Sequence, residues 1–199
     1  GLIKAGAGTL RLSGANLFTS NASVAGGRLL IAHGSALGDT TGTTAVSSGA
    51  QLMLEDGVTV TGETLELAGS GLNFTGALSA AANAAATWNG PVVMGSGARV
   101  GTEAGGVLTL AGPVSGGSLI ISAYGSGADT GTVVVSNAAN SFAGPVSIFR
   151  GALRLGVDNA LPTGVTLDVD AANSPTEPSV FDLGGFDQTI GQLTRSAAS

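Results

Sequence analysis

Short stretches in which two aliphatic residues flank one outward-facing residue recur along the whole chain. Leu10-Arg11-Leu12 and Leu65-Glu66-Leu67 are examples, and similar stretches lie at 29–31, 52–54, 108–110, 133–135, 153–155 and 165–169. Alternation with a period of two places the aliphatic residues on one face of a strand and residues such as Arg11 or Glu66 on the other. Gly, Ser, Asn or Thr bounds each stretch, which is typical of strands joined by turns. We expect the Ala-rich run at 77–87 to be strand or irregular structure, because Asn83 interrupts it and no helix cap precedes it.

The chain also contains a long internal repeat. The matched pairs are Gly8–Ser13 with Gly131–Ser136, Asn16 and Phe18 with Asn140 and Phe142, Gly27–Ile31 with Gly151–Leu155, and Ala36-Leu37 with Ala160-Leu161. A one-residue shift separates the first of these matches from the rest. A repeat made of short strands buries its apolar face only by stacking on the next repeat. We therefore predict one continuous segment over residues 1–199, with repeat copies near 4–38 and 127–162.

Three all-β architectures suit such strands: a sandwich, a barrel and a parallel β-helix. A sandwich of this length usually has aromatic core residues and hairpin turns, but aromatic residues make up only 4% of the chain. The hairpin-type dipeptides Asn89-Gly90 and Asp56-Gly57 each occur once. In a parallel β-helix like residues stack above like residues. The pattern favours the β-helix, or solenoid, with roughly eight to ten coils of about 20 to 25 residues each.

The same residues resemble a known repeat. The segment 4–16, with Phe18 and residues 24–31, is similar to the autotransporter-associated β-strand repeat, and 131–161 resembles a second copy. Residues 76–110 are similar to the linking coils of such proteins, and 181–193 to another of their recurrent elements. The resemblance implies a right-handed, single-stranded parallel β-helix in a passenger that is secreted from, or displayed on, a Gram-negative bacterium. It also implies a C-terminal membrane barrel of alternating strands with aromatic girdles. The chain instead ends at Arg195–Ser199, so we expect a fragment, a processed product or a protein exported by another route.

Composition narrows the possible partners. Charged residues make up 10% and hydrophobic residues 43% of the chain, so we expect it to fold and not to be disordered. The net charge is −6 and the seven basic residues are dispersed along the sequence, which argues against binding to nucleic acid or to an anionic membrane. The longest uncharged stretch, 67–98, is interrupted by Gly, Asn and Pro, so no membrane-spanning helix is expected. With no Cys and only His33, a zinc site is not expected, and no cofactor is implied.

Paired carboxylates are the remaining route to catalysis, because glycosidic cleavage uses two carboxyl groups about 5 to 9.5 Å apart. The candidate pairs are Glu55 with Asp56, Asp168 with Asp170, and Asp182 with Asp187. Asp168 and Asp170 are expected to share an outer strand face, which any solvated strand would also show. The same residues with Asn173 lack the Gly and the bidentate Glu of a calcium loop.

Three other features have simple structural interpretations. No Gly-x-Ser-x-Gly motif accompanies His33, so a turn is expected there and no nucleophilic triad. The Asn-x-Ser/Thr sequences at Asn21 and Asn73 are expected by chance in this composition. Trp88 and Tyr124 could stack on sugar rings, but a core or ladder position is the expectation.

We therefore predict a non-catalytic extracellular scaffold or adhesin segment of an autotransporter-type passenger, without catalytic, cofactor-binding or metal-binding residues. The expected partner is a protein or glycan on the host or cell surface. Two alternatives stay open: an enzyme that acts on polysaccharides through surface carboxylates, and a repeat protein that associates end to end. The second alternative follows from the apolar start Gly1-Leu2-Ile3, which shows no evident polar cap.

Overall fold

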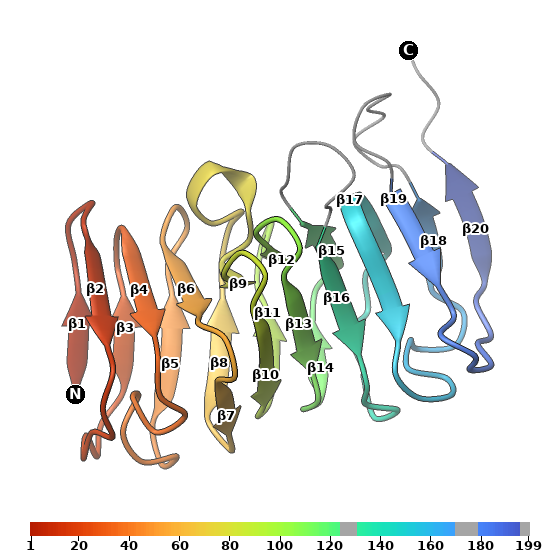
Figure 1. Cartoon of the computed structure of the whole chain (residues 1–199). Helices are drawn as coiled ribbons and strands as arrows, with labels where there is room; N and C mark the ends of the chain where they lie inside the picture. Colours follow the sequence, from red (N-terminus) through yellow and green to blue (C-terminus); the bar gives the residue numbers. More distant parts are fainter. Residues whose placement is uncertain (124–130, 170–178, 196–199) are drawn as a thin grey trace.

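Short parallel strands follow one another around a common axis in the computed structural model, which describes residues 1–123, 131–169 and 179–195 (Figure 1). They form three sheets along the axis. Sheet A contains β1 (Leu2–Lys4), β3 (Ala22–Val24), β5 (Thr43–Val46), β8 (Thr64–Leu67), β11 (Val92–Met94) and β14 (Val114–Gly116). Sheet B contains β2 (Thr9–Leu12), β4 (Arg28–Ile31), β6 (Gln51–Leu54), β9 (Leu78–Ala80), β12 (Arg99–Thr102), β15 (Leu119–Ser122), the first half of β17 (Val146–Leu155), β18 (Thr166–Val169) and β20 (Gln192–Arg195). Sheet C contains β7 (Thr59–Thr61), β10 (Ala85–Asn89), β13 (Val107–Leu110), β16 (Thr132–Val135), the second half of β17 and β19 (Ser179–Asp182).

The architecture is a β-solenoid of about eight turns, as the strand pattern predicts. From left to right in Figure 1 the chain advances from its N-terminus, with the near strands β2 and β4 running down and the fainter β1 and β3 running up. This sense of rotation is right-handed. The Ala-rich run at 77–87 contributes to β9 and β10 and forms no helix. The one helical element among the described residues is a 3₁₀ turn, η1 (Leu72–Phe74).

Inward-facing residues stack in ladders that fill the interior. One ladder in sheet B consists of Leu10, Leu29, Leu52, Leu78 and Val100. One ladder in sheet C consists of Val60, Trp88, Leu110, Val135 and Leu155. Trp88 and Leu110 are both fully buried. The core position expected for Trp88 is therefore confirmed, whereas Tyr124 lies outside the described residues.

Matched residues of the two repeat copies each pair with the next coil, although the two copies lie in different sheets. Leu10 pairs with Leu29, nineteen residues later, in sheet B, and Val133 pairs with Leu153, twenty residues later, in sheet C. The difference of one residue is the shift seen between the copies in the sequence. A turn amide then joins neighbouring coils in each copy: the Nδ2 atoms of Asn16 and Asn140 donate to the carbonyls of Ala36 and Ala160, each at 2.7 Å. One repeat is thus one coil, and its Asn bonds it to the next.

Lys4 adds a polar group to the first coil. It stands in the inward ladder that continues with Val24 and Val46, and it is 6% exposed. Its Nζ donates to the carbonyl oxygens of Ala5, Gly6 and Gly26 at 3.0, 2.8 and 2.8 Å. The long apolar stem fills the core position while the ammonium group satisfies turn carbonyls. The first coil is therefore not purely apolar, although its strand sequence suggests so.

Candidate interaction surface

Three carboxylates that the sequence offers as candidates for catalysis form contacts between coils. Glu55 accepts from Arg11 at 2.6 and 2.7 Å, and this bond holds the pKa of Glu55 below its ordinary value. Asp56 accepts from the backbone N–H of Ala85 at 2.8 Å. Asp182 lies 3.4 Å from Arg154. These contacts join one coil to another, which is a structural use of the charges.

The pair of Asp168 with Asp170 cannot be assembled from the described residues. Asp168 lies on β18, but Asp170 and Asn173 fall outside the part of the chain that the structure describes. Asp187 is exposed in the turn after β19, and its backbone N–H donates to Asp158 at 2.9 Å. No group of three or more potential metal ligands occurs in residues 1–123, 131–169 and 179–195.

His33 occupies an exposed turn after β4, as expected. Its Nδ1 accepts from the backbone N–H of Ser35 at 3.0 Å, so the imidazole closes the turn locally.

Within the described ranges, no helix is long and apolar enough to span a membrane.

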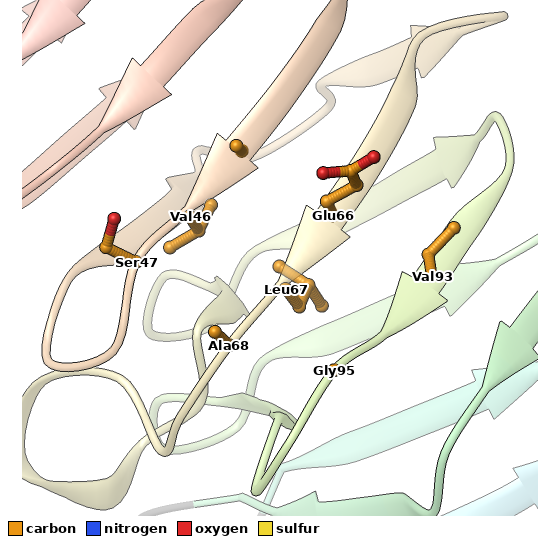
Figure 2. A pocket seen from close by; sticks show the side chains of 8 residues that line it. Val46, Ser47, Glu66, Leu67, Ala68, Val93 and Gly95 are labelled. Atoms are coloured by element: carbon orange, nitrogen blue, oxygen red, sulfur yellow. The ribbon is translucent and has the colours of Figure 1, made fainter.

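A shallow depression on the outside of sheet A has a volume of about 340 Å³ (Figure 2). The eight lining residues are Ala45, Val46, Ser47, Glu66, Leu67, Ala68, Val93 and Gly95. Most are small or apolar, and Glu66 supplies the one ionisable group of this lining. The depression therefore has little chemistry with which to recognise a ligand.

The fourth coil carries extra residues that fold over the outside of sheet B. Leu52 and its partner Leu78 are 26 residues apart, against nineteen for Leu10 and Leu29. The additional length forms an outer loop, residues 69–77, which contains η1 and projects in yellow in Figure 1. The loop lies close to the sheet at Gly101 on β12. A Cβ added at Gly101 would lie 2.6 Å from the carbonyl oxygen of Thr75, so a residue without a side chain is needed there.

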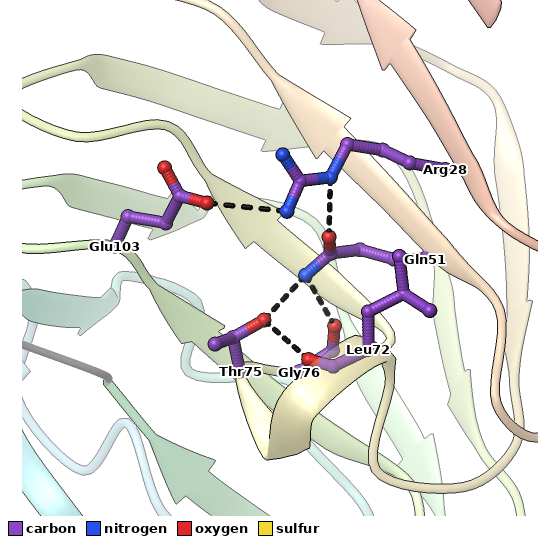
Figure 3. A network of polar contacts seen from close by, with 6 residues as sticks. All are labelled: Arg28, Gln51, Leu72, Thr75, Gly76 and Glu103. Carbon is purple, nitrogen blue, oxygen red and sulfur yellow. Dashed lines mark hydrogen bonds and ion pairs between the residues drawn. The ribbon is translucent and has the colours of Figure 1, made fainter. Parts of the chain in front are cut away.

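A polar network that spans four coils anchors the outer loop (Figure 3). Gln51, which is fully buried, donates from Nε2 to Thr75 Oγ1 at 2.6 Å and to the Gly76 carbonyl at 3.1 Å. Arg28 donates to Gln51 Oε1 at 2.8 Å and to Glu103 Oε1 at 3.2 Å. Because Gln51 uses both ends of its amide, the network fixes the loop at a defined height above sheet B.

The anchored loop holds its tip in an unfavourable backbone conformation. Asn73 and Phe74 have φ values of +49° and +63°, a region that non-glycine residues rarely adopt. The Phe74 carbonyl accepts from Ser122 Oγ on β15 at 2.6 Å, and the Phe74 side chain is 62% exposed. A large apolar ring is thus displayed to solvent at the cost of backbone strain.

A β-bulge presents two further side chains on the same sheet. Between β15 and β17, Ile121 pairs with Ile148, but Ser122 pairs with Arg150, so Phe149 is the extra residue. The alternation of buried and exposed positions along β17 is interrupted there, and Phe149 and Arg150 are both partly exposed in succession. Bulges commonly redirect side chains in this way.

Arg99 on β12 joins these features into one cluster. Its guanidinium carbon lies 4.4 Å from the ring centre of Phe149 and 5.6 Å from that of Phe74. Burial and the positive charge of Arg150 lower the pKa of Arg99 from its ordinary value. We call Phe74, Arg99, Phe149 and Arg150 the arginine–phenylalanine cluster.

The sequence patterns did not identify this cluster. Arg99 and Arg150 are among the basic residues that are dispersed in the sequence, yet the fold brings their charges together. The spacing of 26 residues between Leu52 and Leu78 indicates extra residues in that coil, but Leu167 and Leu193 are equally far apart, so the spacing alone does not distinguish it. The ring contacts leave no mark in the hydrophobic pattern, and the bulge shifts that pattern by only one position.

Comparison with known families identifies the repeats. Residues 2–31 and 128–155 match a family model described as the passenger-associated-transport-repeat. The two segments overlap the copies expected near 4–38 and 127–162. Together with the parallel solenoid, they are consistent with an autotransporter passenger repeat. No curated protein and no solved structure matches the chain significantly.

Proposed function

We propose that this chain is a non-catalytic, extracellular scaffold segment of an autotransporter passenger, secreted from or displayed on a Gram-negative bacterium. One observation carries the proposal: the two segments that match the passenger-associated-transport-repeat stack by equivalent strand pairs and equivalent Asn–Ala bonds. The repeats therefore serve to continue the solenoid, and their matched residues are used for stacking.

The distribution of polar contacts supports a scaffold. Inward ladders run through successive coils, and backbone groups of each coil bond the next. Such an assembly is a quasi-one-dimensional rod whose stability comes from neighbouring coils. The charged pairs Arg11–Glu55 and Arg154–Asp182 also join coils. Because each of these carboxylates is paired with an arginine, neither is well suited to transfer protons to or from a substrate.

An adhesive role for part of the rod is supported by the arginine–phenylalanine cluster. Exposed aromatic and arginine side chains are the groups that most often dominate binding energy at protein surfaces. We infer that this cluster faces a protein or glycan on the host or on another cell.

Export is the direct test. Antibodies raised against the purified chain should label intact cells of the producing bacterium, or detect the chain in its culture medium. A cytoplasmic protein should stay unlabelled on the same intact cells, and labelling of the chain only after lysis would contradict the proposal.

The enzymatic alternative has its own test. If a preparation of the chain degrades a surface polysaccharide and Asp168→Ala abolishes that turnover, the scaffold proposal is wrong. Asp158→Ala serves as the matched control, because Asp158 binds a backbone N–H of the next coil.

End-to-end association is a second candidate, favoured by the last described coil. Val180, Leu183 and Leu193 are 45%, 45% and 64% exposed, and a depression of about 540 Å³ is lined by Val169, Phe181, Leu193, Thr194 and Arg195. A second copy stacked here would cover these exposed side chains. Light scattering should then show a mass that rises with concentration and falls for Leu193→Asp, and a strict monomer would exclude it.

A further inference from the structure

We propose that the arginine–phenylalanine cluster binds the carboxylate or sulfate groups of an acidic glycan, with Arg99 as the anion-binding residue. This role rests on the proposed function in one respect: display outside the cell would bring the site into contact with such glycans. The binding groups are Arg99, Phe149 and Arg150 on the outer face of sheet B, together with Phe74 in the outer loop.

Arg99 has hydrogen-bond donors to offer a ligand. A guanidinium carries five N–H donors in its own plane and no acceptor. Its contacts with Phe74 and Phe149 are made through the central carbon and the ring faces. Among the residues that the structure describes, Arg99 makes neither an ion pair nor a side-chain hydrogen bond. A planar carboxylate or a sulfate can accept two parallel N–H bonds from such a fork.

The local charge favours an anion. Arg150 stands on the same outer face because of the bulge, and its charge acts unfavourably on Arg99. Like charges held together on a partly desolvated face raise the energy of the free protein. An anion bound to Arg99 is attracted by the charge of Arg150 as well, because that charge acts at the position of Arg99.

The exposed ring selects a sugar over an acidic peptide. Phe74 is 62% exposed, and the negative face of an aromatic ring attracts the weakly positive C–H groups of a sugar ring. A net charge of −6 opposes polyanions of high charge density such as nucleic acids, whose binding needs many clustered cations. A glycan with separated charges suits one arginine pair beside one ring.

The site is also organised before a ligand arrives. Gln51, Thr75 and Ser122 hold the outer loop through bonds of 2.6 Å, and the loop keeps Phe74 at a positive φ. Little further ordering is therefore needed on binding, which lowers the entropic cost.

Calorimetric titration of the purified chain tests the proposal with four probes: an oligogalacturonate, a chondroitin sulfate octasaccharide, neutral maltooctaose and oligo-glutamate. The first carries carboxylates and the second adds sulfates, so their comparison identifies the preferred anion. We expect binding of one or both acidic glycans and none of maltooctaose. Arg99→Ala should weaken binding about tenfold to a hundredfold, as loss of a charged hydrogen bond does. Phe74→Ala should weaken it several-fold, and Arg154→Ala, on the same strand as Arg150, should leave it unchanged.

Absence of binding to both acidic glycans would overturn the proposal, and so would each of three other results. They are equal binding of maltooctaose, binding of oligo-glutamate as tight as that of the glycans, and full affinity in a folded Arg99→Ala variant. Fluorescence of Trp88, the single Trp, reports whether each variant is folded. If Arg99→Ala does not fold, Arg99→Lys retains the charge without the planar fork, and unchanged affinity in that variant would also overturn the proposal. A surface-exposed chain without glycan affinity refutes this inference alone, whereas glycan binding by a chain that is never exported refutes the scaffold role alone.

Discussion

Leu110→Ala should be strongly destabilising, because Leu110 is fully buried and stacks directly on Trp88 in the sheet C ladder. The substitution removes three buried carbon atoms, which at about 0.8 kcal/mol each gives a transfer cost of about 2.4 kcal/mol. The neighbouring coils fix the backbone on both sides, so the cavity cannot close fully. The cavity raises the expected loss of unfolding free energy to about 3 to 5 kcal/mol.

Urea unfolding followed by Trp88 fluorescence measures this effect at the site of the change. Buried in the wild-type chain, Trp88 should emit at short wavelength and shift to longer wavelength on unfolding. Thr109→Ala is the matched control: Thr109 is the neighbour of Leu110 on β13 but faces outward, and we expect a change of about 0.5 kcal/mol or less. Equal midpoints for the two variants would refute the stacked-ladder account of stability.

Three further substitutions test other parts of the solenoid. Burial raises the pKa of Glu63, whose Oε1 accepts from Thr44 at 2.7 Å while its Oε2 is buried without a described partner. A carboxyl group whose pKa is raised in the folded state contributes stability below its unfolded pKa of about 4.5, and this contribution is lost as the pH rises through the folded pKa. The urea midpoint of Glu63→Gln should therefore increase relative to that of the wild type as the pH rises. A difference between the two midpoints that stays constant with pH would contradict this account. Gly112→Ala should cost about 1 to 3 kcal/mol in urea unfolding, because the new Cβ would overlap the carbonyl of Gly90 in the preceding coil; an unchanged midpoint would contradict that close approach. Arg11→Ala removes an exposed ion pair and should leave the thermal midpoint unchanged, so a clear drop would show that this pair stabilises the coils.

The sequence predicts the solenoid well because the information for it is local and periodic. Alternation identifies the inward face of strands such as Leu108–Leu110 and Leu153–Leu155, and the repeat indicates that coils stack. It also carries the Asn of the turns, since Asn16 and Asn140 occupy equivalent positions. The sequence pattern does not predict the features in which one coil differs from the others.

The arginine–phenylalanine cluster depends on such departures. Arg99 and Phe149 are 50 residues apart and approach each other only through the order of β12, β15 and β17. The bulge at Phe149 adds one residue to a strand, which breaks the alternation by a single position. Phe74 has a positive φ, a backbone conformation that glycine usually adopts. The contacts that anchor the loop impose this conformation, and the residue type at position 74 does not predict it. Features that arise from contacts between distant coils cannot be read from a period of two.

Stability and binding are therefore separable in this fold. The ladders face inward and set the free energy of unfolding, while the cluster faces outward on sheet B and adds charge repulsion and backbone strain. In a solenoid each coil is stabilised mainly by its two neighbours, so strain at the fourth coil is offset locally. Leu110 belongs to the inward set and Arg99 to the outward one, and each substitution should affect one property and spare the other. A rod of this kind can vary its ligand by changing one loop and one bulge, without altering the stacking that the repeats specify.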